Sequence, residues 1–245
     1  MKILTFVTIF FSIFATQNVV AKVNIPTNLT SDDRIKVLEI LGPGTSSKIL
    51  TDPYPLGGYA GFEAGLQIDS IPVSDIANLG NGVTEQDQFT YPIISIGKGL
   101  YKNVDIFVHF IPSSEGTGIS EYGGILRWGF YQMAYLPVSF SLNLSAGSTN
   151  INNQLIIKNF GYDFTAGITS QNIYFYGGVG QIQSGGEFTG GGTDGVTDTG
   201  QKEEHRVSDA HYFVGVGFRI ASVFLTGQMD FHFQPTYSLK LGFRF

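Results

Sequence analysis

The sequence predicts an all-β fold: a ten-stranded antiparallel up-and-down transmembrane β-barrel with a short N-terminal helix. Three observations lead to this prediction. From residue 56 onward, apolar residues alternate with polar or small ones at a period of two, as in a strand with two different faces. The alternating segments run for about 9–13 residues, and a tilted strand needs about 9–11 to cross a bilayer. The non-apolar face carries charges in mid-strand, as a wet lumen allows.

The first 21 residues have the features of an export signal. Lys2 supplies the positive start, and the apolar run from Ile3 to Phe14 is too short to span a bilayer as a helix. Ala21 is a small residue at a suitable cleavage position. We therefore expect residues 1–21 to be a signal peptide that is removed on export.

Residues 22–55 differ from the rest of the chain and are predicted to form a periplasmic or plugging segment. Within them, residues 31–41 form the one convincing helix, with Ser31 as its N-cap and Gly42-Pro43-Gly44 as its end. Ile35, Leu38 and Leu41 lie on one side of this helix. Eleven residues are too few for a stable isolated helix. We expect it to dock at the periplasmic end of the lumen.

Residues 56–245 are predicted to form the barrel. The expected strands are 56–69, 92–97, 104–111, 121–130, 138–145, 159–168, 173–180, 210–219, 223–233 and 237–245. Connections after the even-numbered strands are short, about 3–5 residues, whereas most of the others are longer, as in barrels with short periplasmic turns and long outer loops. Aromatic residues near strand ends suit the membrane interfaces: Tyr91, Tyr101, Trp128, Tyr131, Tyr135, Tyr162, Tyr212 and Tyr237.

The last strand carries an apolar face to the final residue. Tyr237, Leu239, Leu241, Phe243 and Phe245 alternate with Ser238, Lys240, Gly242 and Arg244. Together with the leader and the alternating strands, this ending resembles that of Gram-negative outer-membrane β-barrel proteins. The resemblance implies an outer-membrane location and implies that the five alternating residues are the signal read by the barrel-assembly machinery. It names no particular family.

Composition excludes several other classes of protein. The chain has 245 residues and no cysteine, which rules out disulfides and thiolate chemistry. Charged residues make up 14 %, well below an ordinary soluble domain. A basic stripe is absent from the sequence, so we expect no nucleic-acid partner. The glycine-rich stretches lack the strand–loop–helix context of a phosphate site, and we expect no cofactor.

Polar residues on the inner face are the candidate functional residues. By strand count, those expected to face the lumen are Asp69, His109, Glu121, Arg127, His211 and Arg219, together with Asp230 and His232. Asp230-x-His232 has the spacing of the catalytic pair in omptins, ten-stranded outer-membrane proteases, where the His–Asp couple activates a water. The partner Asp-x-Asp motif of omptins is missing from the strands. Asp230 and His232 are therefore weak catalytic candidates, and we predict no catalytic residue.

Two further features of the inner face leave alternatives open. His109, His211 and Asp230 could form a metal site on ligand type, although the favoured prediction is ordinary wet lumen residues without a metal. Many inward positions are glycine, which leaves space for water, a ligand or the helix, or permits sharp barrel curvature. These positions are Gly61, Gly65, Gly97, Gly123, Gly129, Gly147, Gly161, Gly167, Gly178, Gly180, Gly215, Gly217 and Gly242.

The predicted function is structural support or small-solute passage in the outer membrane, without catalysis. The first alternative is surface binding or adhesion through extracellular loops 70–89 and 184–207, the second of which is expected to be mobile and without an apolar anchor. The second alternative is an omptin-like hydrolase. Expected partners are outer-membrane lipids, the barrel-assembly machinery and a small solute or hydrophobic ligand.

Overall fold

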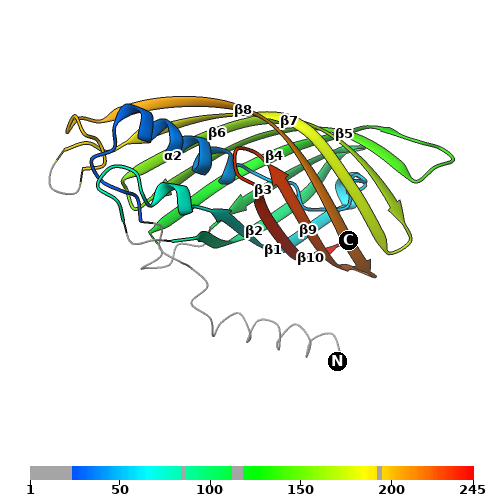
Figure 1. Ribbon diagram of the computed structural model, residues 1–245. Coiled ribbons are helices and arrows are strands. Elements are labelled where there is room, and N and C mark those ends of the chain that lie inside the picture. The colour runs from blue at the N-terminus through cyan, green and yellow to red at the C-terminus, as the bar shows by residue number, and fades with distance from the viewer. Residues whose placement is uncertain (1–23, 84–85, 112–117, 192–194) are drawn as a thin grey trace.

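Ten antiparallel strands close into one barrel in the computed structural model, which describes residues 24–83, 86–111, 118–191 and 195–245 (Figure 1). The strands are β1 (Phe62–Pro72), β2 (Gln88–Tyr101), β3 (Val104–Phe110), β4 (Ile119–Gln132), β5 (Val138–Ile151), β6 (Leu155–Ser170), β7 (Ile173–Phe188), β8 (Glu203–Ile220), β9 (Val223–Phe231) and β10 (Thr236–Arg244). Each strand pairs with its neighbours in sequence, and β1 pairs with β10. The predicted fold class is confirmed. The predicted signal peptide, residues 1–21, lies outside the described residues.

The connections differ between the two ends of the barrel. At the short-turn end they are residues 102–103, 133–137, 171–172 and 221–222. At the loop end they are residues 73–87, 111–118, 152–154, 189–202 and 232–235. The predicted alternation is confirmed, but both long loops are shorter than the predicted 70–89 and 184–207, because strand pairing extends into each.

The barrel begins later than predicted. Residues 56–61 alternate in polarity but are not a strand; Gly58–Ala60 form a 3-10 turn (η1), and Gly57 and Gly58 have positive φ angles. The segment lies against the β2–β3 turn, where a Cβ on Gly99 would collide with the Gly58 carbonyl. Close backbone approach, rather than strand pairing, explains the glycines here.

The outer wall of the barrel is apolar on every strand. Each strand exposes at least one large apolar side chain outward, for example Phe62, Ile96, Val108, Leu126, Leu144, Phe164, Val179, Val214, Leu225 and Leu239. The charged residues that alternate with these apolar residues along the strands point inward and are buried. One predicted interfacial aromatic is wrong: Tyr91 faces the lumen and is fully buried, because it lies in register with the inward residues of β2.

The longest strands cross two environments. Along β6, Leu155 and Ile157 point inward and Lys158 outward, whereas further along Asn159 points inward and Phe160 outward. The pattern is the same on β7 and β8, whose outer faces near the loop end carry Glu187 and Arg206 rather than apolar residues. The loop-end parts of β6, β7 and β8 therefore extend beyond the lipid-facing belt, with apolar side chains inside the barrel and polar side chains outside.

An apolar cluster fills the loop end of the lumen. It contains Ile71, Phe89, Ile93, Ile111, Ile119, Ile151, Leu155, Ile157 and Phe188 from the strands, Val37, Leu38 and Leu41 from the helix, and Ile25, Leu29 and Val196 from the segments above it. Val196 is fully buried, and Leu29 forms a parallel bridge with Thr197. The β7–β8 loop was expected to lack an apolar anchor, but Val196 anchors it in this cluster.

The helix α2 spans Ser31–Gly44, longer than the predicted 31–41. Its N-cap is Thr30 rather than Ser31: the Thr30 side chain accepts from the Asp33 backbone N–H, and Asp33 accepts in return, which is a capping box. Gly42 and Pro43 belong to the last turn rather than ending the helix. Glycine at position 42 lets the helix lie close to β7, since a Cβ there would collide with Ser184. The helix stops at Thr45.

The helix docks at the loop end, so the predicted docking at the periplasmic end is wrong. Val37, Leu38 and Leu41 pack here against the apolar cluster of the loop end. The inward apolar residues Phe107 and Ile125 pack instead against Ile49 and Leu56, further along the chain. Hydrophobic burial therefore decides the position of α2, which lies beneath β6, β7 and β8 in Figure 1.

From α2 the chain runs through the lumen to the short-turn end and enters β1 there (Figure 1). We refer to residues 24–56 as the plug. The barrel thus contains the plug along its whole length.

No helix among the described ranges is long and apolar enough to span a membrane.

Replacing Leu225 by arginine is expected to lower the free energy of unfolding by about 1–2 kcal/mol. Leu225 is the third residue of β9, between the short turn and the middle of the strand, and the cost of a charge on the lipid face falls from about 2–4 kcal/mol at the midplane to about 0–1 at the interface. Leu225 points outward from β9 and pairs with Leu241 and Phe218. Urea unfolding in lipid vesicles measures the change, with Leu225→Met as the control. A cost below about 0.5 kcal/mol, as for an ordinary surface substitution, would contradict the lipid-facing assignment.

Candidate functional site

The plugged lumen

Two arginines on the barrel wall bind the C-terminal end of the plug, where the chain leaves the lumen. Arg127 donates to the carbonyl oxygens of Asp52 at 3.0 Å and Tyr54 at 3.1 Å. Arg244 donates to the same two carbonyls at 3.2 and 2.7 Å, and to that of Pro55 at 2.7 Å. Guanidinium groups therefore satisfy the backbone of a segment that has no secondary structure of its own.

Ion pairs surround this contact at the short-turn end. Arg127 pairs with Asp105 at 2.8 Å, and Asp105 also accepts from the Leu56 backbone N–H. Lys240 pairs with Glu63 at 2.7 Å. Such buried pairs are costly to break singly, because the remaining charge has no partner.

The plug supplies acceptors and donors to these charges. Asp52 pairs with Arg219 at 3.1 Å and accepts a hydrogen bond from Thr169, while Thr51 bonds to Glu63. Arg127 and Arg219 both point inward and contact the plug; Arg127 is buried, whereas the Arg219 side chain is 32 % exposed.

The inward glycines accommodate neighbouring side chains. A Cβ on Gly97 would collide with the Phe107 ring, and one on Gly242 with the Phe224 ring. A Cβ on Gly129 would collide with Pro55 of the plug. The same holds for Gly167 and Pro53, Gly178 and Phe213, Gly215 and Tyr176, and Gly217 and Tyr174. The space that the sequence suggested for a solute is thus occupied by aromatic rings and by the plug.

A second polar group lies in the middle of the lumen. Lys48 of the plug pairs with Asp69 at 3.2 Å, and Asp69 accepts from Gln67 at 2.8 Å. His109 lies 3.5 Å from Glu121 and 3.2 Å from the Ser47 hydroxyl. Asp69, His109 and Glu121 are thus buried inside the barrel, and the plug contacts Asp69 and His109.

A third group combines two histidines with three carboxylates. The rings of His211 and His232 stack with centroids 4.9 Å apart. His211 Nε2 lies 2.8 Å from Asp163, and His232 Nδ1 lies 3.5 Å from Asp209. Asp230 accepts from Gln228, which is buried and also accepts from the Tyr176 hydroxyl.

The structure changes the two interpretations attached to Asp230. The metal alternative of His109, His211 and Asp230 is not brought together; His232 takes the place of His109. Asp230 is buried, and the His232 side chain is 2 % exposed. In this state a peptide has no access to them. The expectation that the protein is not an enzyme stays a prediction.

Several residues of the lumen were not foreseen from the sequence. Lys48 and Asp52 lie in a segment without periodicity, so nothing in the pattern indicated that they face barrel charges. Arg34 of α2 donates to the Leu29 carbonyl at 2.6 Å and to Asp198 at 2.8 Å, which lowers the pKa of the Asp198 carboxyl. Arg34 also bonds to His205 at 3.0 Å; His205 lies on β8, not in the loop as expected.

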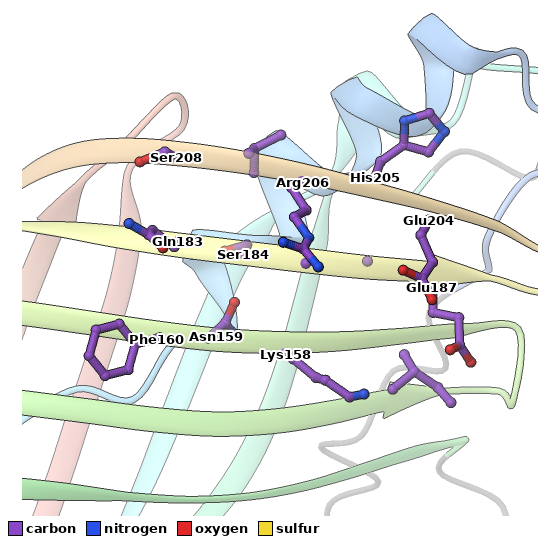
Figure 2. A pocket seen from close by; sticks show the side chains of 14 residues that line it. Lys158, Asn159, Phe160, Gln183, Ser184, Glu187, Glu204, His205, Arg206 and Ser208 are labelled. Carbon is purple, nitrogen blue, oxygen red and sulfur yellow. The ribbon is translucent and has the colours of Figure 1, made fainter.

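A hollow of about 470 Å³ lies on the outer wall, where β6, β7 and β8 extend past the lipid-facing belt. Figure 2 shows Lys158 on β6, Glu187 on β7, and Glu204 and Arg206 on β8 around it. Gly185 lies between Lys158 and Arg206 in register, and its missing side chain leaves the space between the two cations.

A closed barrel with an apolar outer wall on all ten strands and charges inside is stable only in a membrane, and barrels of this construction belong to outer membranes. This protein is an outer-membrane β-barrel. No protein-family model and no curated protein matches its sequence.

Solved structures with a similar arrangement include outer-membrane barrels. Ail of Yersinia pestis, in complex with the heparin analogue sucrose octasulfate, is 13 % identical with a TM-score of 0.32, over 76 % of this chain and 97 % of that one. The N-terminal barrel of Pseudomonas aeruginosa OprF is 12 % identical with a TM-score of 0.32, over 77 % and 99 %.

The outer-membrane protein OmpT of Vibrio cholerae, as a loop L8 deletion mutant, is 7 % identical with a TM-score of 0.32. The match covers 64 % of this chain and about half, 54 %, of that one. Likeness at this level gives no ground for transferring a property of any of these proteins to this chain.

Proposed function

We propose that this protein is a non-catalytic outer-membrane barrel that its own plug holds closed. In the resting state the barrel gives structural support and blocks the passage of solutes; passage requires displacement of the plug. The observation that carries this proposal is the set of hydrogen bonds from Arg127 and Arg244 to the plug backbone. The three acceptor carbonyls belong to Asp52, Tyr54 and Pro55.

The physical argument rests on where the buried charges find partners. Arg127 is 1 % exposed; Asp105 accepts from its Nε, whereas its Nη1 donates to the Asp52 carbonyl of the plug. The plug therefore meets donors of a buried guanidinium that Asp105 alone does not meet. At the other end, α2 buries Val37, Leu38 and Leu41 against the strands. The plug is therefore bound by polar contacts at one end and by apolar packing at the other.

Planar-bilayer conductance tests the proposal. The intact chain is expected to conduct little, and a chain lacking residues 22–54 is expected to conduct steadily, since the deletion removes the plug and leaves β1 in place. Heat-modifiable migration on gels checks that the shortened chain is folded. Equal conductance of the two folded proteins would refute a closed barrel.

A disulfide separates structural support from solute passage. A Cβ on Gly147 would lie 3.2 Å from the Ser47 hydroxyl oxygen, so the two positions are within disulfide reach. In Ser47→Cys/Gly147→Cys, oxidation fixes the plug to β5. If the intact chain shows brief openings that oxidation abolishes and reduction restores, the plug moves to pass solute. If oxidation changes nothing, the role is structural.

Surface binding at the loop end is a second candidate function, favoured by the hollow between β6 and β8. Lys158 and Arg206 lie beside the lipid-facing belt, where an anionic head group of the outer leaflet can reach both. Lys158→Glu/Arg206→Glu is expected to reduce the lipopolysaccharide that co-purifies with the protein. Lys98→Glu, on an exposed lysine of β2, is the control.

A further inference from the structure

We propose that His211, Asp230 and His232 form a binding site for a divalent transition-metal ion of the zinc class, inside the barrel near its loop end. One ligand atom from each residue can be chosen such that all lie within 4.8 Å of one another. The site does not depend on the proposed closed state of the lumen.

The backbone register brings these residues together. Tyr212 on β8 pairs with Phe231 on β9. The next inward pair across these strands is therefore His211 and His232. Asp230 precedes His232 by two residues and points to the same face. His211 and Asp230 thus come from two adjacent strands, and His232 is the first residue after β9. Side chains held on or next to paired strands suit a metal site, which needs rigid supports.

The ring nitrogens are buried without hydrogen-bond partners. Nδ1 of His211 has none, and neither Nδ1 nor Nε2 of His232 has one. His211 is 6 % exposed, and the His232 side chain is 2 % exposed. Buried polar atoms without partners are costly and uncommon. A bound cation would give these nitrogens a partner.

Two further carboxylates lie where they would orient the histidines. Asp163 contacts His211 Nε2 at 2.8 Å, which leaves Nδ1 as the ligand atom. Asp209 lies 3.5 Å from His232 Nδ1 and leaves Nε2. Metal-binding histidines commonly donate their second N–H to a carboxylate in this way.

Gly180 makes the Asp163 contact possible. Gly180 lies between Asp163 and His211 in register, and a Cβ there would collide with the Asp163 carboxylate. Asp230 is fixed separately by Gln228, which donates to both of its oxygens at 3.0 and 3.1 Å. Hydrogen bonds from outside the site therefore hold His211 and Asp230, and Asp209 lies 3.5 Å from His232 Nδ1.

The ligand set selects the class of ion. Two imidazoles and one carboxylate suit zinc and its neighbours in the first transition row, whereas calcium and magnesium prefer sites built only of oxygen. Thiolate-binding ions have no ligand here, because the chain has no cysteine. Three protein ligands leave a coordination position for water.

Zinc binding to the full-length protein in detergent tests the proposal. Chelator-treated protein is titrated with zinc against a competing dye, once in the folded state and once with zinc present during refolding from urea. The expected result is one zinc per chain in at least one arm. His211→Ala and His232→Ala are expected to abolish binding at micromolar zinc, and Asp163→Asn to weaken it by about 10-fold.

His109→Ala is the matched control, because His109 is also a buried lumen histidine but lies beside Glu121, outside the group. It is expected to bind zinc as the wild type does. Cobalt in place of zinc should show visible absorption bands that disappear in His232→Gln, with heat-modifiable migration confirming that this variant is folded. No binding in either arm, or equal loss in His109→Ala, overturns the proposal.

Discussion

Replacing Arg127 by leucine is expected to lower the free energy of unfolding by about 3–5 kcal/mol, because it removes one partner of a buried ion pair. The Arg127 guanidinium contacts the Asp105 carboxylate at 2.8 Å and the carbonyls of Asp52 and Tyr54. Asp105 is fully buried and would keep only the Leu56 backbone N–H as a donor. Urea unfolding in lipid vesicles measures the loss.

Two controls separate the cost of an unpaired charge from a general effect of the substitution. Arg127→Leu/Asp105→Leu removes both charges and is expected to recover much of the lost stability. Lys202→Leu breaks the exposed pair with Glu187, where the lysine is 61 % exposed, and is expected to cost less than about 1 kcal/mol. If Arg127→Leu costs no more than Lys202→Leu, the arginine does not hold the plug as described.

Deleting Phe245 is expected to reduce severely the amount of folded, heat-modifiable protein in the outer membrane. Phe245 and Phe62 exchange backbone hydrogen bonds at 2.9 and 3.1 Å, which extends the pairing of β10 with β1 by one residue. The deletion removes both bonds and an outward ring that is 68 % exposed. Membrane fractions compared on heated and unheated gels measure the yield.

Phe243→Asp is expected to act in the same direction, since it places a charge on the outward face of β10, and Phe243→Leu is the matched control. Tyr237, Leu239, Leu241, Phe243 and Phe245 share this face, as the alternation predicted. Recognition of these five residues by the barrel-assembly machinery stays a prediction. Wild-type amounts of folded barrel for the deletion and for Phe243→Asp would argue against it.

The fold could be predicted from the sequence because strand periodicity is a local property. Alternation between lipid-facing Leu239 and lumen-facing Lys240 needs no knowledge of neighbouring strands. The inward orientation of Asp69, Arg127 and His211 followed from the same alternation. Parity alone places a side chain on one face or the other, so these assignments did not depend on the strand ends.

A plugging segment was one of the two predicted roles of residues 22–55, but its contacts could not be predicted, because its partners are distant in sequence. The contact of Asp52 with Arg219 and that of Lys48 with Asp69 join an aperiodic segment to strands that lie elsewhere in the chain. The prediction of where α2 docks was wrong for a related reason. The inward apolar residues Leu155 and Ile157 continue the alternation of β6 with its polarity reversed, and a search for apolar outward faces passes over them.

The histidine group shows the same limit at the level of single residues. The sequence placed His109, His211 and His232 on the inner face of the barrel but could not show which of them meet. Register decides this: β8 and β9 are neighbours, so His211 stacks on His232, whereas His109 lies on β3 beside Glu121.

The path of the plug constrains the order of events in assembly. Residues 24–30 lie at the loop end, while β1 starts at the opposite end, so the chain passes lengthwise through the ring that β1 and β10 close. If the ring closed first, a segment carrying Arg34, Lys48 and Asp52 would have to be drawn through a narrow charged passage. If the strands first curl around the segment, only the β1–β10 seam remains to be joined. In that order of events the strands assemble around the N-terminal segment as a template, and the β1–β10 pairing that includes Phe245 closes the barrel last.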